Sequence, residues 1–212
     1  MNREEYFASW SALHGGARVT GIVKWWLSIS FAISKVLIAF RLTPNLLSLL
    51  GVAASVLSYT FAKHYYALPI LALSLLCDGV DGTVAILTSK DNKRGAMLDS
   101  VCDRISESFW ALGFFALGAP AWVIATAYVF AFTQEYARAR IAGLGDYRID
   151  IVTIAERPVR ASFLAVAMVA WDLKISAVTT LAIVWMVQQG IALVTVMRSG
   201  YTRLHATDGV GD

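Results

Sequence analysis

Residues 77–104 read CDGVDGTVAILTSKDNKRGAMLDSVCDR, and the aspartates in this stretch decide how the chain is interpreted. Asp78 and Asp81 are three residues apart, whereas Asp99 and Asp103 are four apart. Side chains at these spacings lie on the same face of a helix. The SKDNKR segment between the pairs is short and polar, so we predict two antiparallel helices that bring both acidic pairs to one depth.

The composition of the chain is that of a membrane protein. Of its 212 residues, 58% are hydrophobic and 16% are charged, whereas about 25% of a soluble domain is charged. The apolar residues gather in blocks, and a membrane-spanning helix needs about 20 of them. We therefore predict an all-α polytopic membrane protein. The net charge of +3 is too small to indicate nucleic acid as a partner.

Six segments are predicted to be transmembrane helices. In chain order they cover residues 44–62, 66–87, 95–117, 121–141, 158–171 and 175–197, of which the fifth is short for a full span. We expect them to form one domain, residues 44–198, between an N-terminal segment, residues 1–43, and a cytoplasmic tail, residues 199–212.

Residues 21–40 mix apolar and polar side chains. Trp25 and Trp26 follow Lys24, and Lys35 lies further along. That mixture is typical of an amphipathic helix lying in the membrane interface, with tryptophans at headgroup depth. We predict such an interfacial helix ahead of the six spans, and a seventh span is the alternative.

The lysines and arginines predict the orientation of the chain. With six spans and both termini in the cytoplasm, only Lys63 and Lys174 lie in outside loops, and Arg104 lies within a helix. The positive-inside rule favours this arrangement. We expect an integral protein of a bacterial plasma membrane, with both acidic pairs near the cytoplasmic surface.

Four carboxylates in an apolar setting need compensation, because burying an unpaired charge costs much free energy. Oxygen ligands select hard cations such as Mg²⁺, Mn²⁺ or Ca²⁺. Two divalent ions would balance four negative charges and suit displacement at phosphorus. Helix capping or pairing with Lys and Arg is the alternative, and it is the one we favour for Asp91 in the polar loop.

Two glycines, Gly82 and Gly95, each lie beside an acidic pair. A missing side chain at these positions would let a phosphate or a nucleotide approach the backbone. A glycine in a membrane helix is also a packing device, so taken alone neither position indicates a ligand.

The acidic stretch resembles the signature of the CDP-alcohol phosphotransferase family, also named CDP-alcohol phosphatidyltransferase. That pattern is D-x-x-D-G-x-x-A-R, then eight residues, then G-x-x-x-D-x-x-x-D. This chain has the four aspartates, Gly82, Ala85 and Gly95, and it has Ile86 where arginine is expected. Residues 42–45, LTPN, are similar to the start of the family's first span, and the predicted six-helix layout also matches.

The resemblance implies that a hydroxyl of a polar alcohol attacks the β-phosphorus of a CDP-linked lipid, usually CDP-diacylglycerol, and that CMP leaves. It implies that two Mg²⁺ or Mn²⁺ ions are bound by Asp78, Asp81 and Asp99, with Asp103 completing the site as general base. The implied donor pocket is lined by Thr43, Pro44, Gly82, Asn92 and Gly95. A homodimer among membrane lipids is also implied.

Ile86 is the departure from the family pattern. The family arginine would be expected to contact the phosphates of the donor, and isoleucine makes no such contact. Weaker donor binding, a shifted nucleotide, compensation by Lys90, Lys93 or Arg94, and loss of activity all stay open at this point.

A second basic group contains Arg138, Arg140, Arg157 and Arg160. Positive-inside bias and contact with anionic lipid explain such residues, but guanidinium groups also bind phosphate bidentately. The ERP-x-R stretch and the run MLDSVCDRIS resemble actinobacterial phosphatidylinositol-phosphate synthases. That resemblance implies that these four arginines bind the phosphate of inositol phosphate, although phosphatidylglycerophosphate-type synthases share parts of the pattern.

Two other functions stay open. An ion or proton transporter would use intramembrane acids, but transporter sites lie near the bilayer midplane in repeated halves, and no internal repeat is evident. A family member that binds CDP-lipid with weak turnover is the alternative that Ile86 suggests.

Overall fold

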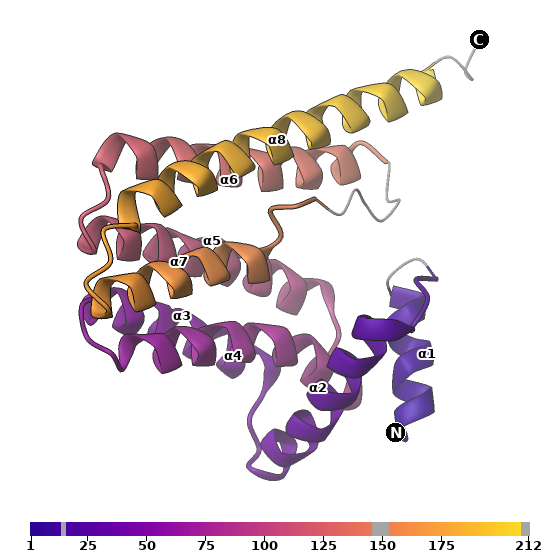
Figure 1. Cartoon of the computed structure of the whole chain (residues 1–212). Coiled ribbons are helices and arrows are strands. Elements are labelled where there is room, and N and C mark those ends of the chain that lie inside the picture. The colour runs from indigo at the N-terminus through magenta and orange to yellow at the C-terminus, as the bar shows by residue number, and fades with distance from the viewer. Residues whose placement is uncertain (14–15, 146–152, 209–212) are drawn as a thin grey trace. The chain divides into compact units, whose positions relative to one another are not determined.

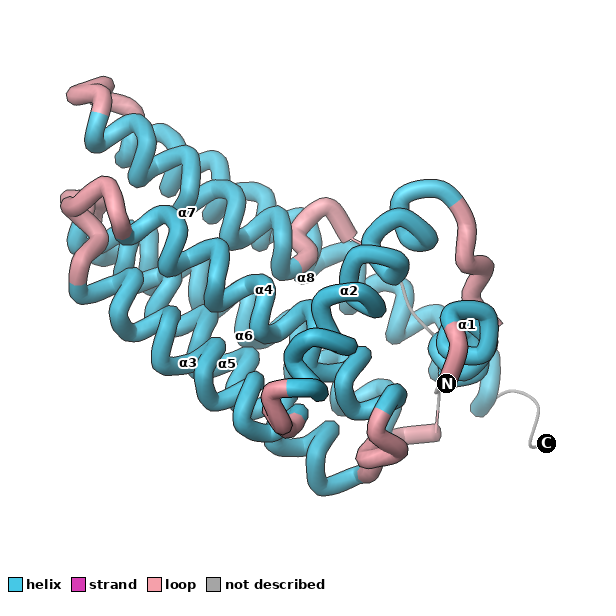
Figure 2. Tube along the Cα trace, turned by 90° about the horizontal axis from the view of Figure 1, so that it is seen from below, coloured by secondary structure: helices cyan, strands magenta, loops and turns pink. Residues whose placement is uncertain are grey.

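The computed structural model describes residues 1–13, 16–145 and 153–208. Within these ranges the secondary structure is helical, without strands, which confirms the all-α prediction (Figures 1 and 2). The helices in chain order are α1 (Arg3–Leu13), α2 (Gly21–Ala39), α3 (Pro44–Thr60), α4 (Ala67–Leu87), α5 (Lys93–Ala116), α6 (Ala121–Gly143), α7 (Arg157–Asp172) and α8 (Val178–Asp208).

The chain forms two compact units. The first comprises Met1–Leu57 and Pro69–Glu107, and the second comprises Ser58–Leu68 and Ser108–Asp212. The four aspartates of the two acidic pairs belong to the first unit, and all four arginines of the basic group belong to the second.

Each predicted span overlaps one helix, but few of these helices have the length and apolarity of a membrane span. Among the described residues, Ala67–Leu87 and Val178–His205 qualify, and a third span is gained if Val23–Ala39 and Pro44–Thr60, bent by 104°, count as one. Helices α3 and α7 have only 17 and 16 residues. Helix α5 is diluted by charged side chains. A membrane protein is therefore supported, and the number of six spans stays a prediction.

Helix α8 continues beyond the last predicted span, which ended at residue 197. It runs to Asp208, so the described part of the predicted tail, residues 199–208, is helical. The remainder of that tail, residues 209–212, lies outside the described residues. The predicted ranges 1–43, 44–198 and 199–212 stay predictions.

Helix α1 was not expected, although a short sequence signal marks its start. The backbone N–H of Glu5 donates to Oδ1 of Asn2 at 2.9 Å, and the backbone N–H of Asn2 donates to Oε2 of Glu5 at 2.8 Å. This reciprocal pair is a capping box, which satisfies backbone donors that a helix leaves open at its N-terminus. The N-x-x-E spacing at residues 2–5 therefore initiates α1.

A tight turn joins α2 to α3. Arg41 adopts a left-handed conformation with φ of 59°, and the backbone N–H of Leu42 donates to the carbonyl oxygen of Leu37 at 3.0 Å. Thr43 then caps α3, because its Oγ1 accepts from the backbone N–H of Leu46 at 3.3 Å. Pro44 occupies the first helical position, where its missing N–H costs nothing.

In the first unit, α3 packs closely on α4. Leu47, Val80 and Val84 form a buried cluster with apolar side chains of α2 around it. A Cβ at Gly51 would lie 3.4 Å from Cβ of Cys77, and Oγ of Ser74 donates to the carbonyl oxygen of Gly51 at 2.8 Å. This close packing fixes the position of α4 one helical turn before its aspartates.

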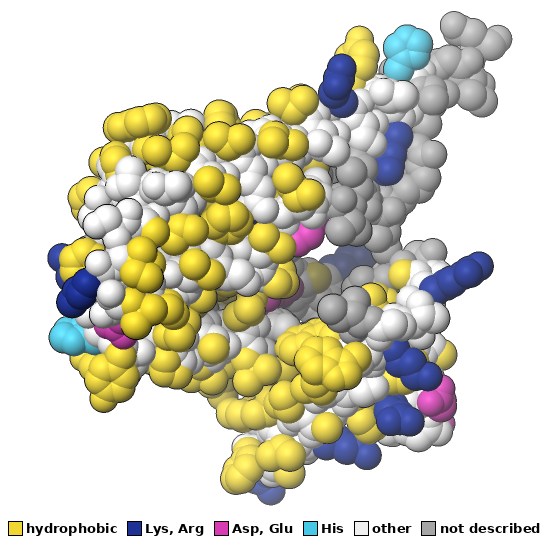
Figure 3. All heavy atoms as spheres, viewed as in Figure 1, with side chains coloured by type: hydrophobic (Ala, Val, Ile, Leu, Met, Phe, Trp, Pro, Cys, Tyr) yellow, Lys and Arg dark blue, Asp and Glu magenta, His cyan; other side chains and the backbone are white. Residues whose placement is uncertain are grey.

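In the second unit, α6 and α8 run parallel to each other (Figure 1). Gly190 lies against Phe130, and Gly200 lies against Ile141. Small residues let two membrane helices approach closely. Hydrophobic side chains cover much of the visible surface over α6 to α8, whereas Lys and Arg side chains gather where α1 and α2 lie (Figure 3).

Candidate active site

Three of the four predicted aspartates converge. Asp78 on α4 and Asp99 and Asp103 on α5 each offer a carboxylate oxygen, and these oxygens all lie within 4.8 Å of one another. All three side chains are half-buried. The two helices are joined by residues 88–92 alone, so the short connection brings the end of α4 to the start of α5.

Asp81, the fourth aspartate, is more deeply buried, with an exposed fraction of 5%. Its Oδ2 accepts a hydrogen bond from Oγ of Ser48 at 2.5 Å, and its Oδ1 accepts from the backbone N–H of Gly82 at 2.6 Å. Asp78 and Asp99 lie close enough to interact with it electrostatically. Ser48, which the sequence analysis did not single out, thus orients Asp81 from α3.

The converging oxygens have the spacing and chemistry of a site for a hard divalent cation. Mg²⁺ binds oxygen ligands at about 2.1 Å, so two ligands of one ion lie at most about 4 Å apart. Carboxylate oxygens within 4.8 Å of one another reach that geometry with small side-chain adjustments. Asp78, Asp99 and Asp103 therefore fit a divalent metal, and Asp81 is adjacent to them.

Asp103 also lies near a basic residue on its own helix. Nη2 of Arg104 is 3.9 Å from Oδ2 of Asp103, whereas Nη1 of Arg104 is 2.9 Å from Oε2 of Glu107. The shorter distance places the guanidinium mainly on Glu107, whose side chain is 4% exposed. The Asp103 carboxylate thus has a long ion pair with Arg104 and lies close to the carboxylates of Asp78 and Asp99.

Two residues predicted to line the donor pocket cap helices. Thr43 caps α3, and Oδ1 of Asn92 accepts from the backbone N–H groups of Arg94 and Gly95 at 3.1 and 3.0 Å, which caps α5. A Cβ at Gly95 would lie 3.6 Å from Oδ1 of Asn45, so the first turns of α3 and α5 are neighbours. Their N-terminal dipoles both favour an anion nearby.

Gly82 and Pro44 complete the predicted donor residues. Gly82 is exposed on α4, and no atom of the described residues lies within 4 Å of a Cβ built there, so among these residues its backbone is open to a ligand. Pro44 begins α3. The caps give Thr43 and Asn92 a structural role, and their contact with a donor stays a prediction.

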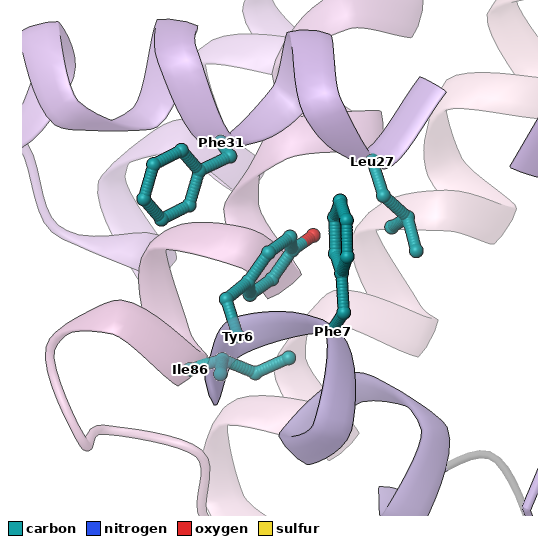
Figure 4. Close-up of a cluster of buried hydrophobic side chains, with 5 residues drawn as sticks. All are labelled: Tyr6, Phe7, Leu27, Phe31 and Ile86. Atoms are coloured by element: carbon teal, nitrogen blue, oxygen red, sulfur yellow. The ribbon is translucent and has the colours of Figure 1, made fainter. Parts of the chain in front are cut away.

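Ile86 is buried under the N-terminal helix. Its side chain, 7% exposed, packs in one cluster with Tyr6, Phe7, Leu27 and Phe31 (Figure 4). Tyr6 and Phe7 come from α1, while Leu27 and Phe31 come from α2. The position of the family arginine is therefore part of an apolar core, and Lys90, Lys93 and Arg94 are exposed residues beyond it.

In the second unit, two of the predicted arginines pair with glutamates. Nη2 of Arg160 is 2.7 Å from Oε1 of Glu135, and Nε of Arg160 donates to the carbonyl oxygen of Ala155 at 2.6 Å. Nη2 of Arg138 is 2.8 Å from Oε1 of Glu156, and Nη1 of Arg138 is 3.3 Å from Oε1 of Glu135. Arg160 is 2% exposed, so its pairing is internal.

Glu156, just before α7, is held in its charged form. Burial alone would raise the pKa of its carboxyl, but the hydrogen bond from Arg138 and those from Thr153 lower the pKa below its ordinary value. The backbone N–H of Thr153 donates to Oε1 of Glu156 at 2.8 Å. The sequence analysis missed both Glu135 and Glu156 as partners, although Glu156 stands in the same ERP-x-R stretch.

The other two predicted arginines differ from this pair. Arg140 is exposed at the end of α6. The guanidinium of Arg157 lies over the ring of Trp110, 5.4 Å from its centre, in a cation–π arrangement. The arginines therefore have unlike surroundings, and their binding of a phosphate stays a prediction.

Comparison with known proteins shows the family to which this chain belongs. A family model described as CDP-alcohol phosphatidyltransferase matches residues 41–197. The archaetidylinositol phosphate synthase of Pyrococcus horikoshii is 34% identical over 131 residues, 59% of this chain and 70% of that protein. The phosphatidylinositol phosphate synthase of Mycolicibacterium smegmatis is 28% identical over 151 residues, 64% of this chain and 65% of that protein.

Two solved structures of one enzyme share the fold. The phosphatidylinositol phosphate synthase of Mycobacterium tuberculosis with bound CDP-DAG has a TM-score of 0.67 at 25% identity, covering 82% of this chain and 94% of that chain. The same enzyme in complex with manganese and citrate has a TM-score of 0.70 at 25% identity, covering 82% of this chain and 89% of that chain.

Proposed function

Because this chain belongs to the CDP-alcohol phosphatidyltransferase family and is an enzyme of that class, we propose that it transfers a phosphatidyl group from CDP-diacylglycerol to inositol phosphate. The observation that carries the proposal is the convergence of Asp78, Asp99 and Asp103 within 4.8 Å of one another. A divalent metal at these acids would be Mg²⁺ or Mn²⁺, and a related synthase has been solved with manganese.

The reaction needs a base and a site that tolerates negative charge. In our proposal Asp103 accepts the proton of the acceptor hydroxyl while that oxygen forms a bond to the β-phosphorus and the bond from phosphorus to CMP breaks. Asp78, Asp81 and Asp99 hold the metal ions, which when bound would stabilise the charge that develops on the departing phosphate. Two ions would balance the four carboxylates.

The donor nucleotide is assigned to the neighbouring first turns of α3 and α5. Thr43, Pro44, Gly82, Asn92 and Gly95 are the proposed contacts. Support comes from the open backbone at Gly82 and from the two N-terminal dipoles, which attract a phosphate. The relative solved with bound CDP-DAG supports the choice of donor.

The acceptor is assigned to the basic group. Arg138, Arg140, Arg157 and Arg160 are the proposed contacts of the acceptor phosphate, with Glu135 and Glu156 orienting Arg138 and Arg160. Support for inositol phosphate comes from the names of two curated relatives described above, an archaetidylinositol phosphate synthase and a phosphatidylinositol phosphate synthase. Glycerol phosphate is the competing acceptor.

The remaining parts of the proposal concern the membrane. We place α2 in the interface, six spans in the bilayer, and both termini with the active site on the cytoplasmic side of a plasma membrane. Exposed Trp25 and Trp26 with Lys24 support the interfacial helix. A homodimer surrounded by membrane lipids completes the assignment, since many apolar side chains of α6 and α8 are exposed in one chain.

The test is release of CMP by purified full-length protein in detergent. Labelled CDP-diacylglycerol and Mn²⁺ are supplied with inositol phosphate, with glycerol phosphate, or with unphosphorylated inositol as the matched control. We expect release with inositol phosphate and a much lower rate with inositol. Release with glycerol phosphate alone would reassign the acceptor, and no release with any acceptor would contradict the proposal.

A further inference from the structure

One face of α4 contacts α1 and α2 through three residues, Gly79, Thr83 and Ile86. A Cβ at Gly79 would lie 2.6 Å from Cζ2 of Trp26, so a larger residue there would displace that ring. Oγ1 of Thr83 shares a hydrogen bond of 2.9 Å with the hydroxyl of Tyr6. Ile86 lies in the apolar cluster of α1 and α2. Positions 79, 83 and 86 follow the spacing of one helical face.

The aspartates occupy the adjoining face of the same two turns. Asp78 precedes Gly79, and Asp81 lies two residues before Thr83. A rotation of α4 about its axis, or a shift along it, would therefore move the carboxylates together with the face that contacts α1 and α2. The N-terminal contacts thus lie on the same two turns of α4 as Asp78, which meets Asp99 and Asp103.

The contact with α1 is specific because it combines a buried hydrogen bond with ring packing. Tyr6 is 0% exposed and Thr83 is 5% exposed, so a hydroxyl that loses its partner here stays away from water. The ring of Tyr6 lies 5.6 Å from that of Phe31 and 5.7 Å from that of Phe7. Burial also raises the pKa of the Tyr6 hydroxyl.

Resting on the proposed function, we propose that Tyr6 is a positioning residue of the metal site. In this role α1 packs against Ile86, the position at which the family pattern has an arginine. Tyr6 positions α4 through its hydrogen bond with Thr83, and Ile86 packs against the apolar side chains of α1. The reaction of this chain thus depends on its N-terminal helix, which lies outside the 41–197 range matched by the family model.

Direct binding of Mn²⁺ to the purified full-length protein tests this role, measured by the loss of the free-ion signal in electron paramagnetic resonance. Tyr6→Phe keeps the ring and removes only the hydroxyl, and Thr83→Val keeps the shape of its partner. We expect the Kd for Mn²⁺ to rise about threefold to tenfold in either variant, and by the same factor in the double variant, because both lose one hydrogen bond.

Tyr128→Phe is the matched control, since the Tyr128 hydroxyl on α6 shares a 2.6 Å hydrogen bond with Ser108 on α5, more than one helical turn after Asp103, and neither residue belongs to α4. It should lower the Tm as much as Tyr6→Phe while leaving the Kd for Mn²⁺ unchanged. A Kd in Tyr6→Phe within twofold of wild type, or effects that multiply in the double variant, would overturn the role. Weaker Mn²⁺ binding in a chain that releases no CMP would support it while the proposed function fails.

Discussion

The acidic cluster brings like charges together, whereas the basic group pairs opposite charges. In the acidic cluster like charges converge, because Asp78, Asp99 and Asp103 bring carboxylate oxygens within 4.8 Å of one another. In the basic group opposite charges pair, with Arg160 at 2.7 Å from Glu135 and Arg138 at 2.8 Å from Glu156. Converging carboxylates repel and favour a bound cation, whereas paired charges are already compensated.

This difference separates two kinds of functional residue. Acids that converge on one another are explained by a cationic ligand that they bind together. An arginine that is buried and paired has a structural reason to be present, so an anionic ligand must compete with Glu135 and Glu156 for it. The aspartates therefore indicate function more strongly than the arginines do.

The largest expected effect comes from the acidic cluster. Asp99→Asn removes one charge from the converging oxygens, and we expect CMP release to fall about a thousandfold, the scale of losing a principal electrostatic contact at an active site. Asp91→Asn is the matched control, since Asp91 is an exposed acid in the loop between α4 and α5 and should stay within twofold of wild type. Equal losses of CMP release in both variants would show that the reaction does not depend specifically on the converging aspartates.

Breaking the paired region should cost stability. Arg160→Ala leaves Glu135 without its closest partner, and we expect the free energy of unfolding to fall by about 3 kcal/mol. The measurement is thermal unfolding in detergent. Arg140→Ala is the control, because Arg140 is exposed and should change stability by less than about 0.5 kcal/mol. An unchanged Tm in Arg160→Ala would mean that Arg160 is held for binding rather than for packing.

Placing the family arginine at position 86 tests the apolar cluster that Ile86 forms with side chains of α1 and α2. Ile86→Arg would put a guanidinium among Tyr6, Phe7 and Phe31, so we expect about 2 kcal/mol of destabilisation and a tenfold or greater loss of CMP release. Ile86→Leu conserves volume and should cost less than about 1.5 kcal/mol. Faster CMP release by Ile86→Arg would instead show that the arginine was missing from a donor pocket.

The pairing of Glu156 predicts a small effect that depends on pH. Its folded-state pKa is lowered, so its stabilisation is present above the ordinary glutamate pKa of 4.5 and is lost as the pH falls through the folded-state value. Thermal unfolding of Glu156→Gln should show a deficit of about 1 kcal/mol or less at neutral pH, given its partial exposure. The deficit should shrink on acidification, and one that grows would contradict the sign of the shift.

The sequence predicted the positions of the helices that carry the site better than the contacts between them. The helix with Asp78 ends at Leu87, as the apolar pattern indicated, and the next begins at Lys93, two residues before the predicted start. The spacing of three and four residues also predicted that the acids meet, because helical periodicity is local. Hydropathy could not fix the number of spans, since α3 and α7 are short and α5 is charged.

Contacts between distant residues were not predictable from one sequence. Ser48 and Asp81 are separated by 33 residues, and Arg160 and Glu135 by 25, and no periodic pattern links either pair. The burial of Ile86 depends on Tyr6 and Phe7, whose helix was not expected. Ile86 was recognised as a departure from the pattern, but its physical reason required the fold.

If the converging aspartates act through a divalent metal, removing the metal should stop the reaction. CMP release from CDP-diacylglycerol is measured with wild-type protein before chelation, after EDTA treatment, and after adding Mn²⁺ back. We expect chelation to abolish release, and Mn²⁺ to restore it in wild type but not in Asp99→Asn. Undiminished CMP release after complete chelation would contradict this role of the metal.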